Sequence, residues 1–523
     1  MESSCVRQTL IPATSKLFGD YLYDFDRVAD FFPYYFGDSE AFVSASKQID
    51  FPDSRRAALV SALREQNGDS DALQKLAQPG TVAVVTGQQV GLFSGPAYTV
   101  LKAVTAAKLA QKLSDSGVAA VAVFWLATED HDLAEVDHAW VFDRHVTPRK
   151  ISLPQTANGG PVGEVAFESW PLDDLRSALG DLPFAEDVIA KVADAYRPGA
   201  TLGSAFRAFL KDILSELDLL YVDPLAPSIR DITAPFLSRA VEEIPSLIPL
   251  VRQRDAELVA RGYHAQVHIE ENSSLLFLVN GKRNAVRWKD GQFVAKDRTY
   301  TTAELAQLGH SLSPNALLRP VMQDYLLPTV AYVGGPAEVA YMAQAQVLYE
   351  KLLGRMPVIF PRNSMTLLDE RATKILDKYG LKVTDLLDTR LQATSRIACK
   401  LVPAGLAEEF GAVRGTLAES IEKLQSDLTG FDPTLEAAAK KSGAKILYQI
   451  DKLARKTANE TMRRNKRAAD DASYVLNLVY PERHLQERFY SIVPFLAKYG
   501  LDLPKQLMEQ TQLACPDHIV RTI

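Results

Sequence analysis

The sequence has few cysteines and no long apolar run. Its three cysteines, Cys5, Cys399 and Cys515, stand far apart in a chain of 523 residues. They form neither a disulfide framework nor a Cys-x-x-Cys zinc motif. The longest apolar run, 118–127, is about half the length that a membrane span requires, and no apolar signal segment opens the chain. These absences predict a soluble cytoplasmic protein with no structural zinc and no membrane partner.

The chain also lacks an excess of positive charge. Its 58 Lys and Arg residues are outnumbered by 65 Asp and Glu residues, which gives a net charge of −7. This balance argues against a general nucleic-acid binder. The length exceeds what one ordinary hydrophobic core supports, so we expect two or three domains.

The most informative stretch begins with an apolar, β-branched run at 81–85 that is typical of a buried strand. A glycine-rich loop at 87–95 follows, then a helix that begins at Pro96, then a strand at 118–126. This order predicts one βαβ unit of a parallel sheet. Ligands bind at the carboxyl ends of such strands, and helix N-termini attract anions. We therefore expect phosphate or carboxylate to be held by Thr86, Gly87, Gln88, Gln89, Gly95, Pro96 and Tyr98, with Lys102 assisting.

Four ionisable residues, Glu129, Asp130, His131 and Asp132, directly follow the second strand. Carboxylates beside a histidine serve as a general base, a metal site or an amine-binding site. The alternative is a polar loop in which Asp130 or Asp132 caps the next helix. Because the group follows a strand end, we favour function and take all four as candidate catalytic residues. No His-x-x-x-His pattern accompanies them, so we expect no fixed metal site.

A second stretch repeats the order of strand, glycine-proline turn, helix and strand. A strand at 329–333 is followed by Gly334-Gly335-Pro336, a helix to about residue 353 and a strand at 357–360. Glu338 falls in the first helical turn, where it either caps the helix or receives a substrate ammonium group. Arginines here can grip a carboxylate or phosphate through two hydrogen bonds. The candidate binding residues of this stretch are Arg319, Gln323, Gly334, Gly335, Glu338, Tyr341, Gln344 and Arg362.

Three further patterns have a structural interpretation that we favour over a functional one. Eight aromatic residues within 21–36 are expected to pack the N-terminal segment onto the main domain rather than to line a ligand site. Asn280-Gly281 predicts a hairpin turn. Its neighbours Lys282, Arg283 and Arg287 are expected on a solvated hairpin edge rather than against a phosphate. The basic run 456–467 is expected to be a solvated helix face, the alternative being a patch for nucleotide phosphates.

Apolar residues spaced by three and four at 410–428 and 435–453 predict a helical hairpin of coiled-coil type, broken at 431–433. A globular core cannot cover so long a seam, so we expect a homodimer through this hairpin. The expected organisation is α/β, with an N-terminal helical segment (1–80), a core formed by 81–142, 201–225 and 313–368, connecting insertions at 143–200 and 226–312, a coiled-coil hairpin (369–470) and C-terminal helices returning to the body (471–523).

Three blocks together resemble one family, the cysteine-adding enzymes of bacillithiol biosynthesis. They are VVTGQQVGLFSGPAYTVLKA, FWLATEDHDLAEVDH, and LLRPVMQDYLLPTVAYVGGPAEVAYMAQ with FPRNS behind it. Their order and spacing agree over essentially the whole chain. The resemblance implies a Rossmann-like core similar to class I aminoacyl-tRNA synthetases, with inserted connecting motifs and a C-terminal coiled coil that pairs two chains. It also implies a ligase that joins cysteine to glucosaminyl-malate in the last step of bacillithiol synthesis.

Amide formation requires an activated carboxylate, so we expect ATP as cosubstrate, accompanied by Mg²⁺ if a metal takes part. Asp130 and His131 are expected to take the proton from the sugar amine, oriented by Glu129 or Asp132, while Glu338 binds an ammonium group. Arg319 and Arg362 are expected to hold the malate carboxylates. Two alternatives stay open, a sugar- or nucleotide-binding dimeric scaffold and a nucleotidyltransferase without ligation. The sequence locates no nucleotide pocket and no zinc cluster to select cysteine.

Overall fold

The computed structural model describes residues 3–154, 159–296 and 298–523. Its centre is a five-stranded sheet in which every neighbouring pair is parallel. The spatial order is β13 (Val358–Pro361), β12 (Thr329–Gly334), β2 (Val82–Gln89), β3 (Ala120–Ala127) and β6 (Leu220–Val222). Counted along the chain this is 5-4-1-2-3, the Rossmann order, in which the first strand lies at the point where the winding reverses. The predicted α/β fold class is confirmed.

The first strand is longer than predicted. β2 extends to Gln89, so Gly87 and Gln88 pair with β3 and do not belong to a loop. Gly87 lies opposite Trp125, and a Cβ on Gly87 would come within 2.9 Å of the Trp125 Cβ. Only glycine permits this close approach of the two strands.

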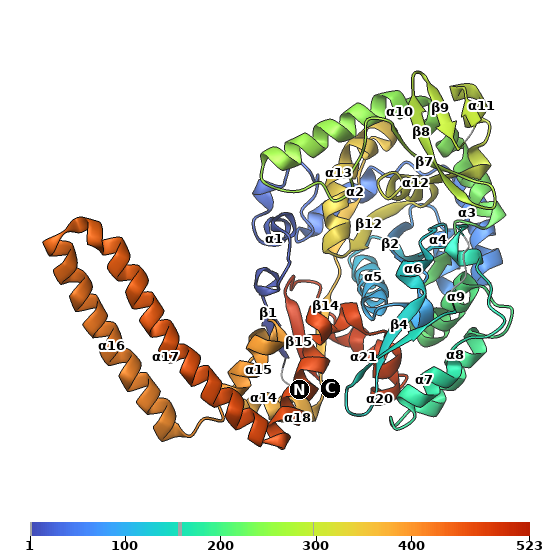
Figure 1. Ribbon diagram of the computed structural model, residues 1–523. Coiled ribbons are helices and arrows are strands. Elements are labelled where there is room, and N and C mark those ends of the chain that lie inside the picture. The colour runs from blue at the N-terminus through green and yellow to red at the C-terminus, as the bar shows by residue number, and fades with distance from the viewer. Residues whose placement is uncertain (1–2, 155–158, 297) are drawn as a thin grey trace.

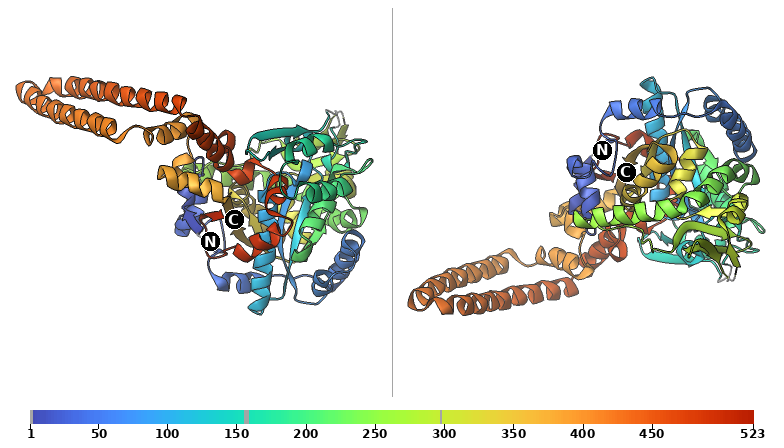
Figure 2. Two further views of the ribbon diagram at one scale, coloured as in Figure 1. Left: turned by 90° about the horizontal axis from the view of Figure 1, so that it is seen from below. Right: turned by 90° about the horizontal axis from the view of Figure 1, so that it is seen from above.

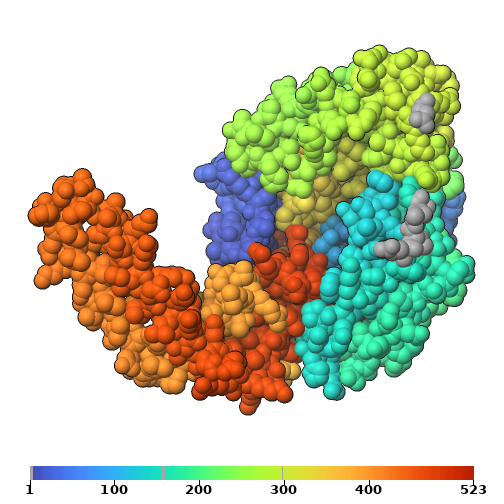
Figure 3. All heavy atoms as spheres, viewed as in Figure 1, coloured from blue at the N-terminus to red at the C-terminus, as the bar shows by residue number. Residues whose placement is uncertain are grey.

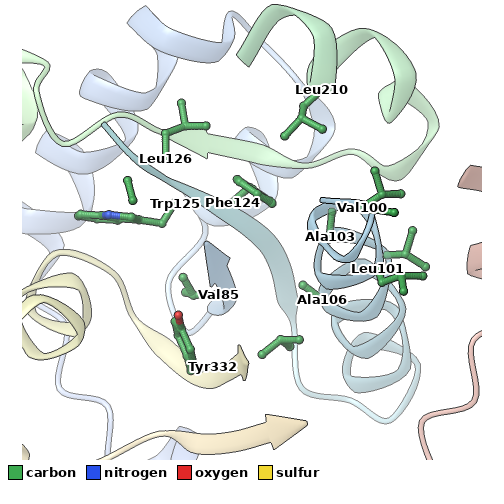
Figure 4. Packing of buried hydrophobic residues seen from close by; sticks show 14 of the residues in the cluster. Val85, Val100, Leu101, Ala103, Ala106, Phe124, Trp125, Leu126, Leu210 and Tyr332 are labelled. Atoms are coloured by element: carbon green, nitrogen blue, oxygen red, sulfur yellow. The ribbon is translucent and has the colours of Figure 1, made fainter. Parts of the chain in front are cut away.

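The helix α5 (Tyr98–Asp115) packs against β2 and β3. Val100 and Ala103 on α5, Val85 on β2 and Phe124 on β3 are all fully buried, and Figure 4 shows them with their neighbours at close range. Full burial of a large apolar side chain contributes about 1.5–3 kcal/mol, which holds the helix to the sheet.

The segment before the core includes a strand that the sequence did not predict, β1 (Ser3–Val6), and four helices, α1 (Lys16–Tyr23), α2 (Ser39–Lys47), α3 (Asp53–Asn67) and α4 (Asp71–Leu76). The packing interpretation of its aromatic residues is confirmed for Tyr21 and Phe32. Both are buried, their ring centroids are 4.5 Å apart, and the Tyr21 hydroxyl donates to the Ile359 carbonyl on β13.

Two insertions separate the core strands. The first contains α6 (Leu133–Val136), β4 (His138–Phe142), β5 (Pro148–Ser152), α7 (Leu172–Leu179) and α8 (Ala185–Ala195), and α9 (Leu202–Ile213) leads back to the core. Residues 155–158 of the predicted insertion 143–200 lie outside the described residues.

The second insertion begins with the long helix α10 (Pro227–Ala260). An antiparallel sheet follows, with β7 (Ser273–Val279), β8 (Arg283–Lys289), β9 (Gln292–Ala295), β10 (Arg298–Tyr300) and β11 (Leu312–Pro314), together with the short helix α11 (Thr302–Ala306). The hairpin predicted at Asn280-Gly281 joins β7 to β8. Figure 3 shows the surface hollowed between this insertion and the first one.

The core is completed by α12 (Arg319–Leu326) and α13 (Pro336–Leu353), and β14 (Ser364–Leu368) then belongs to a separate three-stranded sheet. The helices α14 (Glu370–Tyr379) and α15 (Arg390–Cys399) lead to a hairpin of α16 (Ala404–Phe431) and α17 (Glu436–Arg464). This hairpin projects from the body (Figures 1 and 2). Its two helices touch closely at Gly443, where a Cβ would clash with Ile421. Apolar side chains stay exposed along the hairpin: Val413, Leu424, Phe431, Ile446, Tyr448 and Leu453.

The C-terminal part returns to the body through α18 (Lys466–Val479), α19 (Gln486–Phe489), α20 (Val493–Tyr499) and α21 (Leu503–Gln510). The prediction of helices alone is wrong at the end of the chain, where β15 (His518–Thr522) pairs with β1 on one side and β14 on the other. The chain ends therefore lie together (Figure 1), and the reduced cysteines Cys5 and Cys515 have sulfur atoms 3.7 Å apart.

Candidate active site

A cavity of about 310 Å³ opens at the carboxyl ends of β2, β3 and β12. It lies where the strand order reverses between β2 and β12, the position at which open α/β sheets bind ligands. Most of the residues predicted to bind substrate line it. Those residues are Gly87, Gln88, Gln89, Tyr98, Arg319, Gln323, Gly335, Glu338, Tyr341 and Arg362, and the predicted catalytic residues Lys102 and Asp130 line the cavity as well.

A buried ion pair joins the two βα units at this cavity. Lys102 Nζ on α5 lies 2.7 Å from Glu338 Oε2 on α13, and both side chains are largely buried. The ammonium also donates to the Gly87 carbonyl and to Gln88 Oε1, each at 2.9 Å, so all three of its hydrogens have partners. Lys102 is therefore fixed in place rather than free to follow a substrate.

Glu338 is held by more than Lys102. Its carboxylate accepts a hydrogen bond from the Gly335 N–H, which begins α13, and another from the Tyr332 hydroxyl on β12, both at 2.7 Å. Burial alone would raise the pKa of Glu338, but Lys102 and these donors together hold that pKa below its usual value. Glu338 thus caps its helix, as one of the two sequence interpretations expected, and its charge is already compensated.

Asp130 is the acidic residue that faces the cavity from the end of β3. Its carboxylate accepts hydrogen bonds from Gln89 Nε2 at 2.7 Å and from the His131 N–H at 2.8 Å, and Arg283 lies 3.6 Å away. Burial opposes ionisation, yet these groups lower the pKa of Asp130 below its usual value. The carboxylate is therefore charged at neutral pH.

The other three residues of the predicted catalytic group have different surroundings. Glu129 forms an ion pair with Arg230 at 3.0 Å and faces a side cavity of about 160 Å³; burial raises its pKa. Asp132 caps α6 through the Ala134 N–H. His131 is half exposed at the rim, with Nδ1 3.3 Å from an Arg283 nitrogen. Only Asp130 of the four lines the main cavity.

One wall of the cavity presents N–H donors from Arg319, Gln323 and Trp125. Among the described residues, Arg319 forms no ion pair, and it lines both the main and the side cavity. Gln323 Nε2 and Trp125 Nε1 are buried without a hydrogen-bond partner in the described part of the chain. Buried donors without partners are costly, so this wall of the cavity is suited to an oxygen-rich ligand that satisfies them.

Arg362 closes the cavity on the side of the C-terminal part. Its Nη2 pairs with Glu487 on α19 at 2.6 Å, and Nη1 donates to the Asn363 carbonyl. Glu487 in turn accepts from Ser364, whose hydroxyl lies 2.6 Å from His518 Nδ1 on β15. The last strand of the chain therefore helps to set the position of a cavity arginine.

Five of the predicted binding residues do not line the main cavity. Gly95 and Pro96 lie at a separate cavity of about 120 Å³, because residues 490–491 cover the start of α5. The Thr86 hydroxyl donates to the Val333 carbonyl between strands, and the Gln344 amide holds the backbone of Val267. The fifth, Gly334, ends β12 and pairs with Pro361.

Sequence reasoning missed several lining residues. Trp125 and Tyr332 were treated as strand core, and Arg488 stands in a tail with no motif. Arg283 was expected on a solvated hairpin edge, and this prediction is wrong. Its side chain is 9% exposed, and it donates to the Pro314 carbonyl and stacks over the Phe277 ring. The signal available in sequence was only its place beside a hairpin turn, which does not show what the hairpin packs against.

No helix among the described residues is both long and apolar enough to cross a bilayer. No group of three or more His, Cys, Asp or Glu side chains there is arranged to hold a metal ion.

The fold and the cavity define a Rossmann-like α/β protein with a charged ligand site at the switch point of its sheet and an appended coiled coil. The chain belongs to the bacillithiol biosynthesis BshC family. The family's N-terminal Rossmann-like domain matches residues 1–363, and its C-terminal coiled-coil domain matches residues 365–523.

Curated relatives match over almost their whole length. A protein from Solibacter usitatus is 51% identical over 100% of both chains, one from Koribacter versatilis is 36% identical over 99% of both, and one from Salinibacter ruber is 32% identical over 93% of this chain and 92% of its own. Each of the three carries the name "Putative cysteine ligase BshC".

Proposed function

We propose that the chain is a carbon–nitrogen ligase that joins the carboxylate of cysteine to the amine of glucosaminyl-malate, with ATP activating the carboxylate. The observation that carries this proposal is the switch-point cavity, in which an ionised Asp130 faces an unpaired Arg319. The names of the relatives supply the cysteine and the ligase class.

The donor-rich wall supports binding of a dicarboxylate such as malate. Gln323 and Trp125 present N–H groups that lack partners among the described residues, and the Arg319 guanidinium beside them forms no ion pair there. A guanidinium matches a carboxylate through two parallel hydrogen bonds. Arg362 is less available to a malate carboxylate, because its Nη2 is already paired with Glu487. We therefore assign the malate carboxylates first to Arg319.

Asp130 is proposed to receive the amine. An ionised carboxylate at the cavity wall accepts a hydrogen bond from the neutral sugar amine and takes a proton from it as the nitrogen attacks. The amine nitrogen forms a bond to the carbonyl carbon of activated cysteine. The bond from that carbon to the phosphoryl oxygen breaks, and the leaving phosphate group carries away the electron pair. The proton lost by nitrogen passes to Asp130.

The Lys102–Glu338 pair is proposed to position the cavity rather than to react. Each charge is already satisfied by the other and by neighbouring backbone groups. Separating them to bind a substrate ammonium would leave a buried charge unpaired, which is strongly unfavourable. Their role is to fix the end of β2 and the start of α13 against each other.

The test is mass spectrometry of the purified protein with cysteine, glucosaminyl-malate and ATP, following the amide and the nucleotide together. Amide with AMP supports an adenylate, and amide with ADP supports an acyl phosphate. ATP turnover to diphosphate without amide would indicate a nucleotidyltransferase instead. Substrate binding without ATP turnover would indicate a scaffold and contradict the proposal.

A further inference from the structure

Two of the three cysteines lie together where the chain ends meet. Cys5 is on β1, and Cys515 is in the loop 511–517 that leads from α21 to β15. Their sulfur atoms are 3.7 Å apart, although 510 positions separate the two residues in the sequence. Cys399, at the end of α15, does not contact another cysteine of the described chain. The fold therefore divides the cysteines into one pair and one isolated thiol.

The backbone that carries Cys5 is fixed by strand pairing. β1 and β15 are antiparallel, and Cys5 lies opposite Ile519, which is buried. The next residue on β1, Val6, is buried as well. Because successive side chains of a strand point to opposite faces, the Cys5 side chain points away from the core, and it is exposed. A reagent in solution can therefore reach the Cys5 thiol.

The loop that carries Cys515 is fixed on both sides of the cysteine. The Gln512 N–H donates to Asn363 Oδ1 at 3.0 Å, and the Asn363 amide donates to the Gln512 carbonyl at 3.1 Å. On the other side, the Tyr23 hydroxyl donates to Asp517 Oδ1 at 2.6 Å. The contact between the two sulfur atoms therefore joins two backbone segments that other hydrogen bonds already hold in place.

The same loop touches the support of the main cavity. Asn363 directly follows Arg362, and its carbonyl accepts a hydrogen bond from Arg362 Nη1. A few residues beyond the loop, His518 on β15 contacts the Ser364 hydroxyl. A covalent bond at Cys515 would therefore restrict the segment that supports an arginine of the main cavity.

We propose that Cys5 and Cys515 are a site of thiol–disulfide exchange, at which a low-molecular-weight disulfide converts the pair into an intramolecular disulfide that holds the two chain ends together. This exchange requires no amide formation in the main cavity. The reactant is an oxidised thiol that is small enough to reach a partly exposed sulfur atom. The reverse reaction, with the corresponding reduced thiol, reopens the bond.

The exchange takes two steps. The Cys515 thiolate attacks one sulfur of the external disulfide, so that a bond to Cys515 forms, the external S–S bond breaks and the first thiol leaves with the electron pair. Cys5 then loses its proton and attacks Cys515 Sγ, which releases the second thiol. Two protein thiols are oxidised, one external disulfide is reduced to two thiols, and the protons of the cysteines pass to the leaving thiols.

The surroundings of Cys5 explain why it acts second. Desolvation, together with the contact to Cys515 and the charge of Asp517, raises the pKa of Cys5 to about 11. Cys5 therefore keeps its proton at neutral pH and attacks an external disulfide slowly. Once Cys515 carries the mixed disulfide, the neighbouring Cys5 attacks it as an intramolecular group, which is far more effective than a free thiol in solution.

The experiment is mass spectrometry of the folded full chain after treatment with cystine, with free thiols blocked before proteolysis under non-reducing conditions. We expect a peptide cross-linked between Cys5 and Cys515, while Cys399 is recovered blocked or as a cysteine adduct. Cys5→Ser should retain about tenfold or more adduct on Cys515 than the wild type does, because the second attack is lost. Cys399→Ser is the matched control and should form the cross-link as the wild type does.

Thermal melts measure whether the disulfide holds the chain ends together. The oxidised wild type should melt about 2 °C or more above the reduced protein, because the cross-link restricts the unfolded chain. Cys5→Ser treated in the same way should show no such rise. An unchanged midpoint after complete cross-linking would contradict the role of the bond in joining the chain ends.

Similar adducts on all three cysteines without a cross-link would overturn the proposal, as would cross-links to Cys399 as frequent as those between Cys5 and Cys515. Cross-linking of the urea-unfolded chain as fast as that of the folded chain would also overturn it, because a flexible loop then separates the sulfur atoms. None of these measurements uses ATP or the sugar amine, so a failed ligase reaction would count against the proposed function alone.

Discussion

Two Gly-Pro-Ala sequences begin two helices at neighbouring strand ends, and the structure gives them different surroundings. At Gly95-Pro96-Ala97 the Ala97 N–H donates to the Tyr490 carbonyl, and Pro96 lies beside Ser491. At Gly335-Pro336-Ala337 the Gly335 N–H is capped by Glu338 of the same helix, but among the described residues no distant segment covers the helix start, and Pro336 and Ala337 line the main cavity and a neighbouring cavity of about 340 Å³. The same local motif thus produces a closed helix start and an open one. Whether such a helix start can bind an anion depends on whether a distant segment already accepts hydrogen bonds from its N–H groups.

The largest expected effect concerns the carboxylate that faces the open start. Asp130→Asn keeps the shape of the side chain but removes its charge and its ability to accept a proton. We expect turnover to amide to fall by about 10²–10⁴-fold, measured by the mass-spectrometric assay. His131→Asn is the control, since the half-exposed imidazole does not line the main cavity. A large loss in His131→Asn with activity retained in Asp130→Asn would reverse these assignments.

The next effect concerns the Lys102–Glu338 ion pair, which joins α5 to the start of α13. Lys102→Met leaves Glu338 buried without its cation, and we expect the free energy of unfolding, measured by urea denaturation, to fall by about 3–5 kcal/mol. Adding Glu338→Gln should restore part of that loss. Lys112→Met, at an exposed position on the same helix, should change stability by less than about 0.5 kcal/mol. Equal losses at both lysines would show that the pair contributes nothing specific.

The stability that His518 on β15 contributes should decrease as the pH falls. Burial lowers the pKa of His518 to about 4, although the nearby Glu487 opposes this. The unfolded chain binds the proton near pH 6.5 and the folded chain only near pH 4. The neutral imidazole therefore favours the folded state fully above about pH 6.5, and this contribution is lost as the pH falls towards 4. The difference corresponds to about 3 kcal/mol.

Urea midpoints measured between pH 4 and 7.5 check this prediction. His518→Gln should flatten the profile in that range, whereas His310→Gln, at an exposed position, should leave it as it is. A wild-type profile that is already flat would mean that His518 is not buried as a neutral group.

The smallest expected effects come from replacing the two glycines that precede these helices, Gly95 and Gly335, by alanine. Gly95 has φ of 63°, so Gly95→Ala should cost about 1–2 kcal/mol of stability from backbone strain. Gly335 has φ of −88° and no such strain, but a Cβ there would lie 3.3 Å from Arg362 Nε. We expect Gly335→Ala to change stability less and the KM of substrates more. Thermal melts and steady-state kinetics on both variants measure the two quantities, and matching results for both would remove the distinction.

Much of the fold could be predicted from local sequence. The runs that form β2, β3 and β12 are apolar and β-branched, and glycine and proline mark where they end. Because parallel strands end at one edge, residues as far apart as Gln89, Asp130 and Glu338 were expected to converge, and the structure brings them to one cavity. Adjacent residues on an extended chain point to opposite sides, but the sequence did not indicate which of Glu129 and Asp130 faces inward.

What sequence patterns could not supply are contacts between segments that have no pattern in common. Arg488 lies in a helical tail, yet it reaches both large cavities. The cover over the start of α5 comes from Tyr490, almost 400 positions further on. β15 is too short and too mixed in composition to be recognised alone, since its pairing with β1 and β14 is what makes it a strand. The role of the coiled coil in homodimer formation stays a prediction, supported by the exposed apolar side chains of the hairpin.

The pairing of β1 with β15 has a consequence for the order in which the protein can be made. Residues 3–6 pair with residues 518–521, which leave the ribosome more than 500 residues later. The contacts that support Arg362 run through Glu487 and Ser364 to His518, so they are complete only when His518 is present. A nascent chain can form the Rossmann strands early, but it cannot complete the support behind Arg362 until residue 518 has been made. Truncation near the C-terminus should therefore impair a cavity that is built largely from the first 363 residues.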